Sequence, residues 1–353
     1  MTTSAAPPDP ASIRAAFAAA LARFDRGAPV WLLGHFDADG LAATAILARA
    51  LRAAGWSVRT RIVGRGETPW GAAMGAELAE ERLGGLVICD LGVRGTLPTA
   101  AHTIIIDHHV PLATPDGATV ISGYGARPVP TTSLLAFWCA GALIDPEEML
   151  WLAAIGLIGD MAEGAGFAEM ARARRYGVTA LREAAALVNA PRRTAAADAS
   201  PALALLLTAD GPKAITAGEG PDARALRAAR DEVKAALDAA RRIPPRVRDG
   251  VALISFASPC QIHPLLAQQW RGRLRSEIVV AANAGYRPGW VHFAARTARA
   301  LDLVSWLAER RPPGAGDEYG SGHKAASGGA LSVPDWNGFV RALGFGAEAE
   351  VTA

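Results

Sequence analysis

Carboxylate and imidazole side chains are concentrated in four short segments within the first half of this 353-residue sequence. Such side chains are typical ligands of divalent cations, and a mixed carboxylate and imidazole set suits Mn²⁺. Together they could support metal-assisted hydrolysis. In chain order the segments are His35-Phe36-Asp37-Ala38-Asp39-Gly40, Val87-Ile88-Cys89-Asp90, Ile104-Ile105-Ile106-Asp107-His108-His109 and Ile155-Gly156-Leu157-Ile158-Gly159-Asp160.

Each segment contains or follows an apolar run, which indicates a buried strand or helix that ends at the polar groups. The carboxyl ends of parallel strands meet at one edge of a sheet, so polar groups there can share one site. Side chains alternate between two faces along an extended chain. We therefore expect His35, Asp37 and Asp39 to point the same way.

Four carboxylates gathered in one site would repel one another strongly. Two unit charges about 4 Å apart repel by roughly 4 kcal/mol at an effective dielectric constant near 20. We therefore predict two bound divalent cations, with Mn²⁺ preferred and Mg²⁺ as the alternative. One such segment alone is more often a helix cap or a satisfied polar group, whereas four in this order favour a metal site. The four carboxylates are Asp37, Asp39, Asp90 and Asp160.

These motifs resemble those of the DHH phosphoesterase superfamily, which is named for the triplet that stands here as Asp107-His108-His109. The segment His35-x-Asp37-x-Asp39-Gly40 is similar to the first motif in its RecJ-type form. Asp90 is similar to the second motif and Asp160 to the fourth. The resemblance covers residues from about 28 to 345, which includes the family's C-terminal substrate domain. The resemblance is to RecJ-like and oligoribonuclease-like members of the superfamily.

The resemblance implies a role for each polar group. Asp90 would bridge the two cations, Asp107 would orient His108 as carboxylates commonly do for ligating imidazoles, and His109 would face the substrate phosphate. The implied ligands of the first cation are His35, Asp37 and Asp90, and those of the second are Asp39, Asp90, His108 and Asp160.

A glycine-rich segment, Tyr319-Gly320-Ser321-Gly322-His323-Lys324, resembles the signature of the family's substrate domain. Glycines allow backbone amides to approach an anion, and His323 and Lys324 add donors and charge. Ser321 stands where the family commonly has a glycine. The resemblance thus implies substrate binding by Gly320, Ser321, Gly322, His323 and Lys324, and the alternative is a flexible turn.

Arg296 resembles the arginine with which the family clamps a phosphate, and a guanidinium fork suits that task. The alternative is an ordinary surface arginine. Thr131-Thr132-Ser133 precedes a predicted helix, so we expect its hydroxyls to cap that helix. A phosphate contact from these residues, together with Arg127, is the second possibility.

Apolar runs and amphipathic segments alternate along the first half of the chain, which favours an α/β fold with a parallel sheet covered by helices. The predicted strands are 30–34, 58–63, 86–89 and 103–106, and later 251–257, 277–282 and 290–295. The predicted helices are 11–25, 41–53, 70–83, 132–143 and 146–158, and later 264–273 and 300–310.

We divide the chain into a catalytic metal-binding domain (1–185), a helical connector (186–245) and a smaller α/β substrate-binding domain (246–345). Residues 241–311 contain twelve arginines and four acidic residues, an excess of eight positive charges that suggests an anionic partner. A solvated basic surface is the alternative. The sequence has no apolar run of membrane-spanning length and no signal-peptide pattern. Its three cysteines form no metal-type pair, so we expect a cytoplasmic protein.

The sequence therefore predicts an Mn²⁺-dependent phosphodiesterase that acts as an exonuclease or oligonucleotidase on single-stranded nucleic acid or short oligonucleotides. One alternative is a phosphodiesterase of cyclic dinucleotides or a nucleotide 3′-phosphatase. A non-catalytic scaffold that binds nucleic acid is the other. Strand polarity, DNA or RNA preference, substrate length and oligomeric state stay open.

Overall fold

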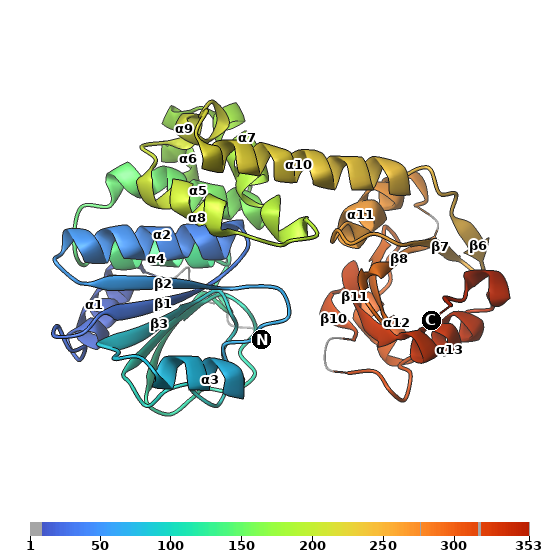
Figure 1. Cartoon of the computed structure of the whole chain (residues 1–353), viewed down its shortest axis with the longest axis horizontal. Coiled ribbons are helices and arrows are strands. Elements are labelled where there is room, and N and C mark those ends of the chain that lie inside the picture. Colours follow the sequence, from blue (N-terminus) through green and yellow to red (C-terminus); the bar gives the residue numbers. More distant parts are fainter. Residues whose placement is uncertain (1–8, 276, 317–318, 353) are drawn as a thin grey trace. The chain divides into compact units, whose positions relative to one another are not determined.

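The computed structural model describes residues 9–275, 277–316 and 319–352 of the chain (Figure 1). It separates into two compact units. The first consists of the described residues up to Arg192 together with Ala197–Arg230, and the second of Arg193–Ala196 together with the described residues from Asp231 onward. The long helix α10 (Pro221–Ala240) passes from the first unit into the second.

The first unit is built on a five-stranded parallel sheet with strand order β2-β1-β3-β4-β5. This confirms the predicted parallel α/β architecture. The central strands are almost fully buried because helices cover both faces, as expected for a parallel sheet. The strands are β1 (Val30–His35), β2 (Val58–Val63), β3 (Gly85–Cys89), β4 (Thr103–Asp107) and β5 (Ala118–Ser122).

Alternate residues of β1 show how the two faces are covered. Leu32 packs into the large core formed with α1, α2, α4 and α5, while Leu33 packs into a smaller core that includes Met74 and Leu78 of α3. Figure 1 shows α3 on the opposite side of this sheet from α2 and α4. The helices are α1 (Pro10–Leu21), α2 (Ala38–Ala53), α3 (Ala72–Ala79), α4 (Thr132–Ala140), α5 (Leu150–Gly159), α6 (Ala168–Ala173), α7 (Val178–Val188), α8 (Ser200–Thr208) and α9 (Pro212–Thr216).

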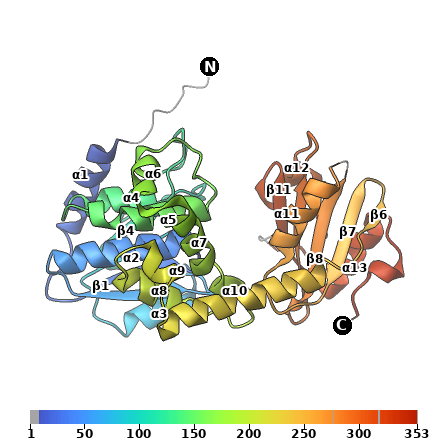
Figure 2. The same ribbon diagram turned by 90° about the horizontal axis from the view of Figure 1, so that it is seen from above.

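The second unit contains a mixed six-stranded sheet with strand order β10-β11-β9-β8-β7-β6. Only the pair β7 and β8 is parallel. In Figure 2, α11 lies along one side of this sheet, where it packs against β8 and β9. The elements are β6 (Arg246–Arg248), β7 (Val251–Phe256), α11 (His263–Arg273), β8 (Ile278–Arg287), β9 (Trp290–Thr297), α12 (Leu303–Ala308), β10 (Ser321–His323), β11 (Ala326–Ser332) and α13 (Val333–Ala342).

Several elements differ from the sequence-based expectation. The strands β5, β6, β10 and β11 and the helix α13 were not predicted. The predicted helix 70–83 is confined to α3, because Trp70 is held outside it by a hydrogen bond from its indole nitrogen to the carbonyl of Leu91. The expected domain boundaries stay a prediction, although the compact units divide the chain near residues 192 and 230. Among the described residues, no helix combines the length and the apolar character needed to cross a membrane.

Candidate metal centre

The first motif joins the end of β1 to the start of α2. His35 is the last residue of β1, Asp37 caps α2 by accepting a hydrogen bond from the Gly40 amide, and Asp39 lies in the first helical turn. The expectation of one extended segment from residue 35 to 39 is therefore wrong. The polar groups still face one site because a strand end and a helix start meet there. A Cβ on Gly40 would lie 2.6 Å from His35, so the tight turn requires glycine.

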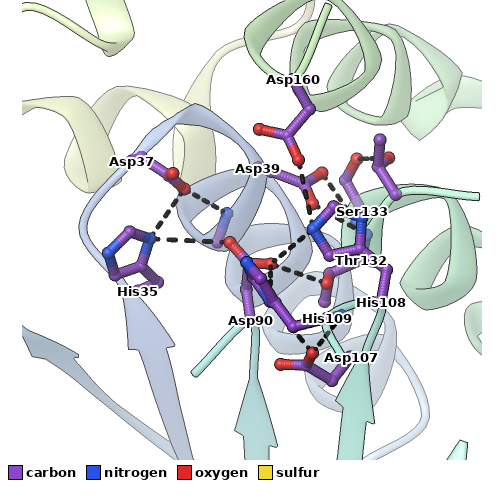
Figure 3. A network of polar contacts seen from close by, with 12 residues as sticks. His35, Asp37, Asp39, Asp90, Asp107, His108, His109, Thr132, Ser133 and Asp160 are labelled. Carbon is purple, nitrogen blue, oxygen red and sulfur yellow. Dashed lines mark hydrogen bonds and ion pairs between the residues drawn. The ribbon is translucent and has the colours of Figure 1, made fainter. Parts of the chain in front are cut away.

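The other motifs reach the same place from three further elements (Figure 3). Asp90 follows β3 with a left-handed backbone (φ 65°), a conformation that aspartate tolerates better than most residues. Asp107 ends β4, and His108 and His109 follow it. Asp160 is the residue after α5.

Among the described residues, three sets of candidate ligands each have all their ligand atoms within 4.8 Å of one another, and we call these sets donor groups. They are His35, Asp37 and Asp90; Asp39, His108 and Asp160; and Asp90, His108 and His109.

Asp90 lies between the other donors. Its Oδ2 is 3.6 Å from Nδ1 of His35, and its Oδ1 is 3.5 Å from Nε2 of His108. The same His108 nitrogen is 3.3 Å from Oδ2 of Asp160. Asp90 thus turns one carboxylate oxygen toward each of the two imidazoles.

The N-terminus of α4 holds Asp39. The Thr132 amide donates to Oδ2 at 2.7 Å, and the Ser133 amide donates to Oδ1 at 3.0 Å. These are two of the amides that a helix start leaves without an internal partner, and they favour a negative charge. Because Asp39 is fully buried, this pair of bonds fixes its orientation. Gly156 of α5 closes the site, since a Cβ there would lie 2.3 Å from Oδ1 of Asp39.

The Asp107 carboxylate supports a different histidine from the one expected. Its Oδ1 accepts a 2.7 Å hydrogen bond from the His109 amide and lies 3.0 Å from Nδ1 of the same residue. Its Oδ2 accepts from the Gly92 amide. The expectation that Asp107 orients His108 is therefore wrong, because the chain turns directly after β4 and brings the second imidazole back over the carboxylate.

Two contacts of the site were not predicted from the sequence. The Thr132 hydroxyl donates to Oδ1 of Asp90 at 2.8 Å, whereas the expected cap of α4 comes from Thr131. Arg192 lies 3.2 Å from Oδ2 of Asp37. The only sequence signals were the run of three hydroxyl residues and an arginine pair after Pro191.

Burial and mutual repulsion shift the proton affinities of the cluster. Burial raises the pKa of Asp90 to about 8, and the charges of Asp37 and Asp39 act in the same direction. Burial likewise raises the pKa of Asp160 to about 9, together with Asp39 and Asp90. Although burial disfavours a charged imidazole, the carboxylates of Asp37 and Asp90 outweigh it and raise the pKa of His35 to about 10. The raised pKa values of Asp90 and Asp160 therefore indicate more carboxylates than the positive charge of the metal-free cluster can balance.

The residues present fit divalent cations. The donors are carboxylate oxygens and imidazole nitrogens, and the three cysteines of the chain are buried and form no part of the donor groups. Nδ1 of His35 is buried and lies 3.1 Å from Oδ1 of Asp37 and 3.6 Å from Oδ2 of Asp90, so a single cation could contact all three donors. This donor chemistry suits Mn²⁺ or Mg²⁺ rather than structural zinc.

The residues expected to bind substrate lie in the second unit. Gly320 and Gly322 both have positive φ, and Gly322 has no room for a Cβ, which would lie 2.4 Å from the Ala326 carbonyl. The Gly320 amide is used within the sheet, where it donates to Gly328. His323 and Lys324 are exposed near the turn between β10 and β11. The side chain of Ser321 lies outside the described part of the structure.

Arg296 is half-buried on β9, where its guanidinium donates to the carbonyls of Ala295 and Ser327.

Comparisons with known proteins found related sequences and structures. Residues 29–157 match the family described as the DHH family, N-terminal domain. The single-stranded-DNA-specific exonuclease RecJ of Thermus thermophilus is 31% identical over 228 residues, an alignment that covers 54% of this chain and 34% of that protein. The chain thus spans about a third of its curated relative.

Solved structures show a similar fold. A crystal structure of exonuclease RecJ bound to manganese superposes with a TM-score of 0.67 at 23% identity, covering 94% of this chain and 93% of that one. RecJ from Thermus thermophilus in complex with Mn²⁺ gives a TM-score of 0.68 at 24% identity, covering 94% of this chain and 54% of that one.

Proposed function

Since residues 29–157 of this chain form a DHH-family N-terminal domain, we propose that the protein is a two-metal phosphoesterase that hydrolyses phosphodiester bonds. The preferred substrate is single-stranded nucleic acid or a short oligonucleotide, which is cleaved from one end to mononucleotides. The relative from Thermus thermophilus is a single-stranded-DNA-specific exonuclease, and this supports the proposed substrate class.

The convergence of the donor groups on Asp90 is the observation that carries the proposal. His35, Asp37 and Asp90 would hold one divalent cation. Asp39, His108 and Asp160 would hold the other, with Asp90 shared. When bound, the cations supply a water of lowered pKa and positive charge beside the phosphoryl oxygens.

The protein side chains orient these ligands and hold the substrate. The α4 amides and the Thr132 hydroxyl fix Asp39 and Asp90 before any cation arrives. His109 is about half exposed, and its hydrogen bond with Asp107 raises its pKa to about 9. It therefore carries a proton at neutral pH, and we assign it a contact with the substrate phosphate or with the leaving oxygen.

The second unit would bind the rest of the substrate. We assign the terminal or scissile phosphate to Arg296, because its guanidinium is half-buried on β9 and donates to backbone carbonyls, with no carboxylate partner among the described residues. The exposed turn with His323 and Lys324 would supply further donors.

Turnover of labelled strands of graded length, measured with Mn²⁺, Mg²⁺ or EDTA, tests this function. We expect metal-dependent release of mononucleotides and no release by Asp90→Asn, which replaces the proposed bridge with a group of similar size. Cyclic dinucleotides and nucleoside 3′-phosphates belong in the same assay as the competing substrates. Metal uptake without hydrolysis of any of these would favour the non-catalytic scaffold and refute the proposal.

A further inference from the structure

The C-terminal end of α11 carries a cluster of arginines. Arg271 and Arg273 lie in the last turn of α11, and Arg275 follows two residues later. Among the described residues, none of the three pairs with a carboxylate. The sequence contains no acidic residue from Gly250 to Arg275.

This arginine surface (Arg271, Arg273 and Arg275) is open to solvent and partly pre-ordered. Arg273 and Arg275 are exposed, and Arg271 is half-buried. The guanidinium of Arg273 lies 5.3 Å above the Trp270 ring, and Trp270 packs against the core between α11 and the sheet. An arginine held on an aromatic ring loses less side-chain freedom when it binds an anion.

The arginine surface continues to Arg296 within the same unit. Helix α11 packs directly on β9, which carries Arg296. After burial, the positive charge of Arg271 is the other influence that lowers the pKa of Arg296. The printed hydrogen bonds of Arg296 go to backbone carbonyls rather than to a carboxylate. A row of neighbouring cations without counter-charge calls for a polyanion, which can bring several negative charges at once.

We propose that the arginine surface binds the phosphodiester backbone of single-stranded nucleic acid, as a continuation of the phosphate assigned to Arg296. This inference rests on the proposed function and adds a substrate length to it. Strands long enough to reach Arg271, Arg273 and Arg275 would bind more tightly than dinucleotides, which end at Arg296. Single-strand sites of this kind place cations along the path of the backbone.

Binding of labelled strands to the full-length chain in EDTA, which prevents cleavage, tests the surface directly. The variant is R271Q/R273Q/R275Q. Its matched control is R23Q/R52Q/R174Q, which removes the same charge from exposed arginines of the first unit that form no ion pair among the described residues. Circular dichroism and melting temperature confirm that both variants are folded.

We expect the α11 variant alone to bind strands of about 16 nucleotides more weakly, by about tenfold or more. The slope of log K against log salt, which is negative, should become shallower by about 2. Each lost phosphate contact on a single strand reduces the size of this slope by about 0.7. Dinucleotide affinity should stay unchanged. Equal strand affinity and salt slope in the two variants would overturn the proposal, as would a wild-type chain that binds no strand.

Turnover separates this inference from the proposed function. We expect wild type and the α11 variant to hydrolyse a dinucleotide equally, and only the variant to show a raised KM for the longer strand. That result would support both the hydrolase function and the arginine surface. Wild type that binds strands through α11 but cleaves nothing would refute the hydrolase and leave the surface intact. Equal KM values of wild type and variant on every strand length would refute the surface and leave the hydrolase intact.

Discussion

The hydroxyl of Thr132 donates a 2.8 Å hydrogen bond to Oδ1 of Asp90, while the amide of the same residue donates to Asp39. One residue at the start of α4 thus orients a ligand in each of the two principal donor groups. Both contacts are buried, so water cannot replace them when they are lost.

We expect Thr132→Val to weaken Mn²⁺ binding by about tenfold, which is the usual range for the partner of a metal ligand. The valine keeps the backbone amide and the shape of the side chain but leaves Asp90 without its donor. Thr132→Ser should bind as wild type does, because it restores the hydroxyl. Isothermal titration calorimetry measures the Mn²⁺ affinity of both variants. If the valine variant bound Mn²⁺ as tightly as wild type, the Thr132 hydroxyl would have no positioning role.

Asp160→Asn should stabilise the metal-free protein and at the same time remove one cation from the bound form. Burial and the charges of Asp39 and Asp90 make an ionised Asp160 costly in the empty site. The amide removes that charge at similar size. Melting temperature in EDTA should rise, and the Mn²⁺ stoichiometry should fall from two to one. Asp116→Asn, at an exposed position outside the site, is the control, and a lower melting temperature of Asp160→Asn in EDTA would contradict the prediction.

Without metal, the protein should lose stability as the pH rises from about 7 to about 9. Asp90 and Asp160 have folded-state pKa values of about 8 and about 9, above the ordinary value of 3.8. Their contribution to stability is therefore fully present below pH 3.8 and is lost as the pH rises through these values.

The raised pKa values of His35 and His109, about 10 and about 9, act in the same direction within this window, and the lowered pKa values of His108 and His263 act below about pH 6.5. Saturating Mg²⁺ should reverse the trend, because cations bind the deprotonated ligands. Melting curves at several pH values, with EDTA or Mg²⁺, measure both effects. A metal-free melting temperature that rises toward pH 9 would contradict the prediction.

Gly156→Ala should damage the site through packing alone. The added Cβ would lie 2.0 Å from Oγ of Ser133 and 2.3 Å from Oδ1 of Asp39, so α4 and α5 would have to move apart. Overpacking of this kind costs about 1–3 kcal/mol, and the displaced Asp39 should also weaken Mn²⁺ binding. Gly164→Ala meets nothing within 4 Å and is the control. Chemical denaturation and Mn²⁺ titration of the two variants should therefore differ clearly.

Local sequence was enough to predict where the candidate ligands stand in the chain. Val30–Gly34, Leu86–Cys89 and Thr103–Ile106 read as buried strands, and polar groups directly after them must lie at one sheet edge when the strands are parallel. The same reasoning does not reach β5, β10 and β11, whose residues are mixed or glycine-rich and are strands because of their neighbours.

The sequence by itself determined the residue types of the candidate centre, because carboxylates and imidazoles in these motifs suit one kind of cation. Only the tertiary structure decided what holds them. The partners of Asp90, Asp39 and Asp37 lie 42, 93 and 155 residues away along the chain. No local periodicity records such contacts, since they depend on how α4 and the end of the first unit pack against the sheet edge. The pairing of Asp107 with His109 was likewise set by a chain turn that the residue pattern does not show.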